Sequence, residues 1–189
     1  MTKILQLFTN DAILVRALQK GDAKAQRQLY EKYSGRMLAI CVRYVSDTMA
    51  AEDVMIEGFM KIFDKIDQYK GDGSFEGWMK RLMTNEALMY LRSHKSFVEI
   101  DLDEPEARFI STSASADQNI ETEELYKILE KLPTGYRTVF NLYAIEGYSH
   151  AEIAEQLGVT ESTSKSQLHR ARAMLQEMIT VFNGQQKIG

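Results

Sequence analysis

The sequence predicts an all-α protein in which two helical domains are joined by an acidic flexible linker. Apolar residues recur at spacings of three and four on both sides of residues 97–124, and no strand alternation or internal repeat is visible. Only two prolines occur in 189 residues. Residues 97–124 hold nine acids and one base, with Pro105 and few apolar residues, which is typical of a flexible connector. We therefore expect a domain over residues 10–96, a linker over 97–120 and a second domain over 121–182.

The N-terminal domain is predicted to contain three long helices, a three- to four-helix arrangement in all. The apolar stripe of the first helix is Tyr30, Tyr33, Met37, Ile40, Cys41 and Tyr44. After a break near residues 46–47, the stripe of the second is Ala51, Met55, Phe59, Ile62 and Ile66. The run Gly71-Asp72-Gly73 predicts a turn, and a third helix is expected from about residue 74 to residue 94.

The C-terminal domain is predicted to end in a helix-turn-helix. One helix closes with Leu125, Ile128, Leu129 and Leu132, and Pro133 opens another that carries Tyr136, Val139, Phe140 and Tyr143 and ends at Gly147. Ser149 and Glu152 then have the spacing of a capping box, before a short helix with Ile153, Ala154 and Leu157 on one face. Gly158 suits a left-handed turn, and Thr160 caps a longer helix that runs to about Met178.

The last helix separates into an apolar face and a polar face when residues are placed at 100° per step. The inner face holds Leu168, Ala171, Leu175, Met178, Ile179 and Phe182. The outer face holds Ser162, Ser166, His169 and Arg170, flanked by Lys165 and Arg172. Such a face suits a DNA major groove, with Arg170 or Lys165 on guanine edges and with Ser162 and Thr163 on phosphate. A solvated basic helix is the alternative. Ser164 projects towards the core, where this motif usually has Val or Ile.

The third helix of the first domain carries an unexpected polar stripe. Trp78, Arg81, Asn85 and Arg92 fall within about 60° of one another on an ideal helix. Its apolar face is Phe75, Met79, Leu82, Met83 and Tyr90. An aromatic ring, cations and an amide in one line suit single-stranded nucleic acid. Tyr69 and Lys70 lie just upstream with the glycine loop, where an unstacked base could be held. The alternatives are a core position for Trp78 and a plain solvated face for the rest.

Composition excludes several other classes of protein. A chain with 44% hydrophobic and 26% charged residues is an ordinary globular protein, and no secretory leader or membrane-length apolar run is visible. We expect a cytoplasmic protein without membrane insertion. The single cysteine, Cys41, excludes an internal disulfide and a cysteine-rich metal site, and His169 has no second ligand at a helical spacing, so no metal is predicted.

The net charge of −4 is concentrated in the linker. Residues 97–124 have a net charge of −8, which leaves the rest of the chain at +4. The acidic segment is either a solvated spacer or a mimic of nucleic acid that suppresses DNA binding by the isolated protein.

With these motifs in order, the chain resembles the extracytoplasmic-function (ECF, group 4) sigma factors of the sigma-70 family over residues 10–180. AAEDVMIEGFMKIFDKI is similar to the family's polymerase-binding helix; Asp53, Glu57 and Phe59 match, Glu52 lies beside them, and Ile56 replaces a usual Gln. GSFEGWMKRLMTNEALMYLR is similar to the minus-ten element, with matches at Phe75, Trp78, Asn85 and Arg92. The C-terminal domain resembles the minus-thirty-five-binding domain. There Lys165, Ser166, His169 and Arg170 face DNA, and Gln167 replaces a usual Arg.

The resemblance implies a bacterial transcription initiation factor with no catalytic residue and no cofactor. Its partners would be core RNA polymerase, through the clamp of the largest subunit, and promoter DNA, and an anti-sigma factor is usual in the family. The linker would run towards the RNA exit path. The alternative is a helix-turn-helix regulator that acts without polymerase. An enzyme has little support, because His94, His150 and His169 are scattered and no nucleophile–base pair is evident.

Overall fold

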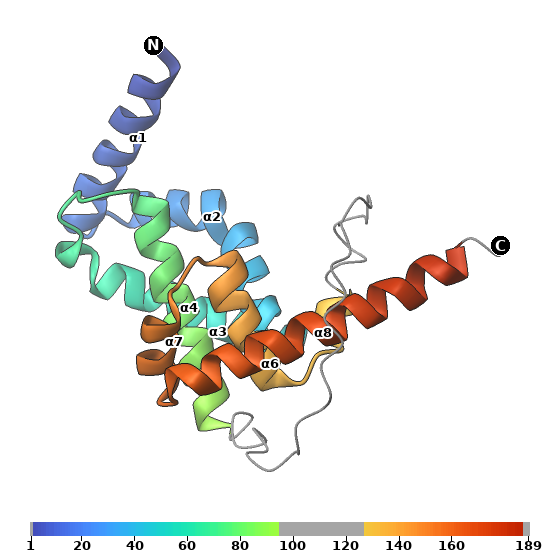
Figure 1. Ribbon diagram of the computed structural model, residues 1–189. Helices are drawn as coiled ribbons and strands as arrows, with labels where there is room; N and C mark the ends of the chain where they lie inside the picture. Colours follow the sequence, from blue (N-terminus) through green and yellow to red (C-terminus); the bar gives the residue numbers. More distant parts are fainter. Residues whose placement is uncertain (1, 95–126, 187–189) are drawn as a thin grey trace. The chain divides into compact units, whose positions relative to one another are not determined.

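The protein is represented by a computed structural model that describes residues 2–94 and 127–186 (Figure 1). The chain divides into two compact units, Met1–Ser93 and His94–Gly189, here the N-terminal and C-terminal units. Every regular element in the described residues is helical, as predicted. None of these helices combines the length and the apolarity that a membrane span requires. The expected linker, residues 97–120, lies outside the described residues, as does Leu125.

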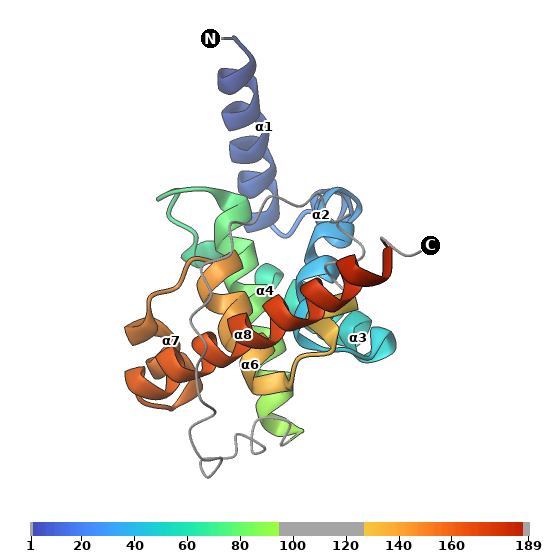
Figure 2. The same ribbon diagram turned by 45° about the vertical axis from the view of Figure 1, so that its right-hand side comes forward.

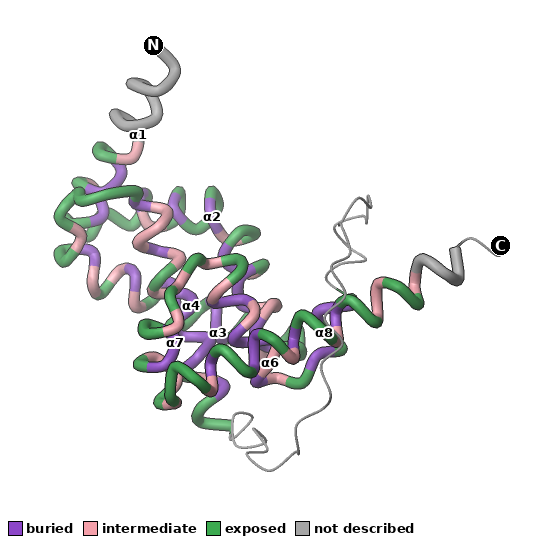
Figure 3. Tube along the Cα trace, in the orientation of Figure 1, coloured by how far each residue is buried: buried purple, intermediate pink, exposed green. Residues whose placement is uncertain are grey.

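The N-terminal unit is built on three mutually packed helices. These are α2 (Ala23–Tyr44), α3 (Thr48–Asp64) and α4 (Phe75–Ser93). Helix α1 (Thr2–Gln19) lies against α2 and against the short 3₁₀ helix η1 (Ile66–Gln68). Buried and exposed positions alternate along each helix, and Figure 3 shows this pattern. The three apolar stripes predicted from the sequence therefore face one core.

Three members of the predicted stripes depart from this pattern, since Leu82 and Tyr90 are only partly buried and Tyr30 is exposed. Tyr30 is 41% exposed, whereas the other five residues of its stripe are buried. Its ring centroid lies 5.0 Å from that of Phe59. Tyr30 therefore covers the edge of the core instead of filling it.

Aspartate caps begin two of the helices, and the second cap lies at the break that the sequence predicted near residues 46–47. The Asp22 carboxylate accepts hydrogen bonds from the backbone N–H groups of Lys24 and Ala25 at 2.8 and 3.3 Å. The Asp47 carboxylate accepts one from Ala50 at 2.8 Å. Each cap satisfies amide groups that have no partner within the helix, so α2 and α3 begin at fixed residues.

The contact between α3 and α4 requires a glycine. A Cβ atom built on Gly58 would overlap the sulfur of Met83, which is fully buried on α4. Nearby, the Lys61 ammonium lies 2.7 Å from the carboxylate of Glu86, which is only 5% exposed. The two helices are thus held together by close packing at Gly58 and by one ion pair whose carboxylate is buried while its ammonium stays partly exposed.

The described part of the C-terminal unit consists of four short helical elements and one long helix. A helical turn at residues 127–130 precedes α6 (Thr134–Phe140), the π-helical turn η2 (Asn141–Ile145) and α7 (His150–Leu157). They are followed by α8 (Glu161–Gln186), against which α6 and α7 pack (Figure 2). Part of the core is formed by Ile128, Leu129, Leu132, Ala171 and Leu175.

The sequence analysis expected one regular helix from Pro133 to Gly147, and this was wrong in one respect. The helix widens at η2, where the π-helical turn inserts an extra residue into the helical repeat. Leu142 is fully buried, whereas Tyr143 is only partly buried. The buried positions Gly135, Val139 and Leu142 keep spacings of three and four, so the predicted stripe with Tyr136 and Tyr143 lies beside the face that the core covers.

We expect Gly58→Leu to lower the free energy of unfolding by about 1–3 kcal/mol, because the new side chain must displace Met83 from a filled interface. Gly35→Leu is the matched control, since Gly35 is an exposed residue of α2 with nothing within 4 Å of its Cβ position. That change should leave stability equal or higher, because leucine is the better helix former. Urea unfolding of both full-length variants measures the difference, and equal losses would contradict the close approach.

Candidate nucleic-acid and partner interfaces

The predicted helix-turn-helix is present in the C-terminal unit. The Ser149 hydroxyl accepts the backbone N–H of Glu152 at 3.3 Å, and the Glu152 carboxylate accepts the backbone N–H of Ser149 at 2.8 Å. This reciprocal pair is the expected capping box. Gly158 ends α7 with φ 68°, in the left-handed region where a Cβ atom is disfavoured. These two features fix the start of α7 and the turn into α8.

The first turn of α8 is rich in hydroxyl groups. Thr160 Oγ1 accepts the backbone N–H of Thr163 at 3.1 Å, and it lies 2.8 Å from the hydroxyl oxygens of both Ser162 and Thr163. The Ser166 hydroxyl donates to the Thr163 carbonyl at 2.9 Å. A helix N-terminus bordered by small hydroxyls attracts anions such as phosphate.

The outer face of α8 broadly matches the prediction. Its exposed members are Ser162, Lys165, Ser166, His169 and Arg172, and Thr163 and Arg170 are partly buried. Lys165 pairs with Glu161 at 3.4 Å, but both side chains are more than half exposed. Such an exposed pair contributes little and can be exchanged for a phosphate.

Arg170 differs from the expected outward position. Its Nη1 donates to the Tyr136 hydroxyl at 3.1 Å, and Tyr136 packs against the core cluster of the unit. The side chain therefore leans towards α6 along the edge of the DNA-facing surface. On an ideal helix Arg170 lies about 80° from Ser162, which explains its partial burial.

The inner face of α8 contains two polar residues. Ser164 is fully buried, as its predicted direction implied, and its hydroxyl lies 2.9 Å from Nδ1 of His150 on α7. Gln167 is 3% exposed, and within the described part of the chain neither polar atom of its side chain has a hydrogen-bond partner. The side chain of Gln167, which stands where the family usually has Arg, is thus directed inwards in this chain.

In the N-terminal unit, three aromatic rings gather at the start of α4. The ring centroid of Tyr69 lies 5.1 Å from that of Phe75 and 5.5 Å from that of Trp78, and Phe75 and Trp78 stack at 5.9 Å. The Tyr69 hydroxyl donates to the Gly73 carbonyl at 2.8 Å, which closes the loop between them. Gly71 and Gly73, with φ 85° and 84°, allow this tight path.

The three rings differ in their access to a ligand. Phe75 is 4% exposed, so the expectation that it contacts DNA is corrected: it supports the other two rings from below. Trp78 and Tyr69 are partly buried, and each keeps some accessible surface. Trp78 is therefore neither a simple core residue nor a fully exposed one.

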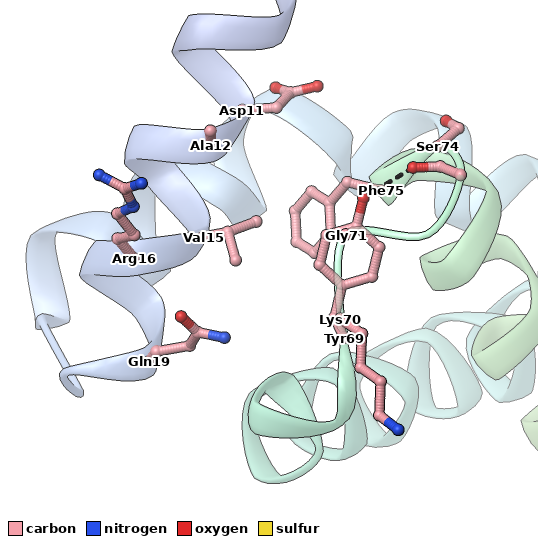
Figure 4. A pocket seen from close by; sticks show the side chains of 11 residues that line it. Asp11, Ala12, Val15, Arg16, Gln19, Tyr69, Lys70, Gly71, Ser74 and Phe75 are labelled. Atoms are coloured by element: carbon pink, nitrogen blue, oxygen red, sulfur yellow. Dashed lines mark hydrogen bonds between the residues drawn. The ribbon is translucent and has the colours of Figure 1, made fainter.

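A cavity of about 610 Å³ opens beside this aromatic cluster. One wall is the loop from Tyr69 to Phe75 with exposed Lys70, and the other is α1 (Figure 4). Val15 and Gln19 of α1 point towards the rings of Tyr69 and Phe75, while Arg16 points away. The sequence analysis missed the α1 wall, because α1 is some 50 residues distant in sequence and carries no motif.

The polar stripe on α4 lies at the surface. Arg81, Asn85 and Arg92 are all exposed, as the helical wheel predicted. Among the residues that the structure describes, neither arginine takes part in an ion pair. The two cations are therefore available to a negatively charged partner.

Helix α3 presents a mixed acidic and apolar surface, here called the α3 ridge. Its acidic members Glu52, Asp53 and Glu57 are exposed. Between them, Met49, Ile56 and Met60 are exposed to 77%, 48% and 65%. Phe59, which the sequence analysis placed in the polymerase-binding set, is 2% exposed and packs against Tyr30 and Phe63, so it belongs to the core.

The single cysteine of the chain is buried. Burial raises the pKa of Cys41 to about 12, as expected for a packed cysteine. No group of three or more potential metal ligands occurs in the described ranges 2–94 and 127–186.

Two family models match the chain. The model for Sigma-70 region 2 matches residues 29–97, and that for Sigma-70, region 4 matches residues 122–175. Together they cover well over half of the sequence.

Curated relatives match along most of the chain. The RNA polymerase sigma-H factor of Pseudomonas aeruginosa is 28% identical over 181 residues, which are 89% of this chain and 93% of that protein. The ECF RNA polymerase sigma-E factor of Haemophilus influenzae is 29% identical over 180 residues, 89% of this chain and 95% of that protein.

Two solved structures share the fold. The sigma factor RpoE in complex with the anti-sigma factor NepR from Bartonella quintana gives a TM-score of 0.52 at 22% identity, over 82% of this chain and 96% of that one. CnrH in complex with the cytosolic domain of CnrY gives a TM-score of 0.50 at 22% identity, over 89% of this chain and 96% of that one.

Proposed function

The chain belongs to the extracytoplasmic-function group of the sigma-70 family and directs RNA polymerase to promoters, and we propose how its parts divide this work. Residues 10–96 bind the polymerase and read the minus-ten element. Residues 121–182 read the minus-thirty-five element, and residues 97–120 connect the two. The proposal assigns no catalytic residue and no cofactor, and it places the protein in the cytoplasm with the polymerase.

One observation carries this proposal. Exposed Arg81, Asn85 and Arg92 follow one line of α4 from the aromatic cluster, in the unit that lacks the helix-turn-helix. A regulator that binds only duplex DNA through its helix-turn-helix has no use for this second surface. A subunit that stabilises an opened strand needs both cations along the backbone and rings on which bases stack.

Opening of the minus-ten element is proposed to use the aromatic cluster and its loop. The partly exposed faces of Tyr69 and Trp78 offer a surface to an unstacked base, with Phe75 fixing their positions. Lys70, Arg81 and Arg92 supply positive charge for the adjoining phosphates. Asn85 can both donate and accept hydrogen bonds at a base edge.

Duplex recognition is proposed for the outer face of α8. Ser162 and Thr163 at its N-terminus contact a phosphate, while Lys165, Ser166 and His169 face base edges in the major groove. Arg172 lies on the flank of this face and contacts the opposite phosphate wall. Arg170 reaches the groove from the edge of this face, where its guanidinium also donates to Tyr136.

Docking on the polymerase is proposed for the α3 ridge. Glu52, Asp53 and Glu57 meet basic groups on the clamp of the largest subunit, and exposed Met49, Ile56 and Met60 add apolar contact. Ile56 stands where the family usually has Gln. At this position the chain therefore offers the polymerase apolar contact area instead of a hydrogen bond. Core residue Phe59 acts only by holding the ridge in place.

The linker and the partners complete the proposal. Tethering two weak DNA readers raises their effective concentration, so neither must bind tightly alone. The acidic linker lowers the affinity of the free protein for DNA. This effect ends when the polymerase binds the linker. Because RpoE was solved in complex with the anti-sigma factor NepR, and CnrH with the cytosolic domain of CnrY, we propose an anti-sigma factor as a further partner.

Run-off transcription with purified core polymerase tests the whole proposal. Mapping of transcript starts after overexpression supplies the promoters for the assay. Transcription from these promoters should require the added chain, and transcription at an equal level without it would refute the proposed function.

Trp78→Ala should weaken open-complex formation about 5- to 150-fold, the equivalent of one lost base–aromatic stack of about 1–3 kcal/mol. Binding to the closed duplex should remain nearly unchanged, because α8 is untouched. Permanganate footprinting of the holoenzyme on a mapped promoter measures the melted bases. Trp78→Phe retains a stacking ring and serves as the control, and undiminished melting by Trp78→Ala would rule out the role.

Asp53→Lys should abolish stable association with core polymerase, because it reverses a charge at the centre of the α3 ridge. Glu31→Lys is the matched control, with the same charge change on an exposed residue of α2 whose ion pair with Arg27 is solvent-exposed. Co-purification with tagged core enzyme distinguishes the two. Retention of Asp53→Lys at the level of Glu31→Lys would show that polymerase docks elsewhere.

A further inference from the structure

Three elements of the C-terminal unit meet at a small polar cluster that includes Tyr143, His150, Ser164 and Arg172. The rings of Tyr143 on η2 and His150 on α7 stack with centroids 4.6 Å apart and an interplanar angle of 23°. The guanidinium carbon of Arg172 on α8 lies over the Tyr143 ring, 5.6 Å from its centroid. On the other side, His150 Nδ1 contacts the Ser164 hydroxyl at 2.9 Å. None of the DNA contacts proposed above uses Tyr143 or His150.

The contact between His150 and Ser164 fixes α7 against α8. Ser164 is completely buried at the point where the two helices of the motif meet. A hydrogen bond depends on distance and angle, whereas apolar packing at the same position has no preferred direction. The pair therefore defines how α8 is rotated about its axis relative to α7. That rotation decides which side chains face outwards.

The stacked rings of Tyr143 and His150 also restrict the side chain of Arg172. A free arginine side chain samples many rotamers, and this freedom is lost when it binds a phosphate. Attraction between the guanidinium and the Tyr143 ring restricts Arg172 before DNA arrives. Since Arg172 is exposed, its remaining N–H donors stay accessible.

The charge state of His150 suits this arrangement. Burial lowers its pKa, the cations Lys165 and Arg172 act in the same direction, and only Glu161 opposes them. The partly buried Tyr143 ring covers it from η2, and Ser164 contacts it from α8. The lowered pKa favours the neutral imidazole, which does not repel Arg172.

We propose that Tyr143 and His150 are positioning residues for promoter binding, which hold the Arg172 guanidinium at the flank of α8 where a phosphate of the minus-thirty-five duplex is bound. This inference rests on the proposed contact between Arg172 and DNA. It adds two residues outside the recognition helix that set how well that contact forms.

A double-mutant cycle in the holoenzyme tests this proposal. Full-length variants are assembled with core polymerase, and the affinity for a mapped promoter is measured by titration at several salt concentrations. Arg172→Ala should lower affinity and reduce the slope of log affinity against log salt by about 1. Tyr143→Leu should lower affinity about two- to fivefold when Arg172 is present, the range of an exposed cation–π contact. It should have no further effect in the Arg172→Ala background.

Two matched variants separate positioning from general stability. Tyr143→Phe keeps the ring beneath Arg172 and should bind like the unmodified chain. Tyr148→Leu makes the same substitution at a neighbouring, partly buried tyrosine and should leave the salt slope unchanged. If thermal unfolding shows that Tyr143→Leu does not fold, Tyr143→Met, which removes the ring but keeps a long side chain, takes its place in the cycle with the same expected coupling to Arg172.

Each result of the double-mutant cycle either supports or overturns the proposal. An equal loss of affinity from Tyr143→Leu with and without Arg172 would overturn the positioning role, as would failure of Tyr143→Phe to restore binding. If Arg172→Ala alone leaves affinity and salt slope unchanged, the proposed DNA contact is itself wrong and the positioning role falls with it. Only loss that depends on both the ring and the guanidinium supports the proposal.

Discussion

Close packing of α3 on α4 is the constraint on which the N-terminal unit depends, because these two helices carry different surfaces. Helix α3 presents the ridge proposed to meet the polymerase, and α4 presents the stripe proposed to meet opened DNA. Gly58 lets the backbones approach, and the ion pair between Lys61 and Glu86 holds their alignment. A closely packed interior moves as one body. Docking of the polymerase on α3 therefore also fixes the position of α4.

The C-terminal unit uses a different means to position its DNA-facing residues. Its recognition helix is fixed by local polar geometry: a capping box at Ser149, a left-handed turn at Gly158 and the buried contact of Ser164. These interactions are short-range and directional, and they lie close to the side chains that they orient. The C-terminal unit has an apolar core of its own, and these hydrogen bonds add to it next to the DNA-facing side chains. They keep that surface preformed.

Sequence signals within single helices predicted several of these features. The capping box, the turn glycine and the α4 stripe all follow from spacing along a single helix, and the structure places them as expected. Motif matching was less reliable for Phe59 and Phe75, because a matched letter does not reveal whether a side chain is buried. The tilt of Arg170 towards Tyr136 and the α1 wall of the cavity depend on contacts between distant segments. The π-helical turn at residues 141–145 has no signature in the spacing of apolar residues.

The single cysteine has a consequence for how such a factor can be controlled. Cys41 is sealed inside the helical core, and its thiol keeps its proton far above physiological pH. Because only the thiolate reacts readily with peroxides and disulfides, oxidants find no ready target in this sulfur. Any direct control of this subunit by an oxidant must therefore act on a group other than this thiol.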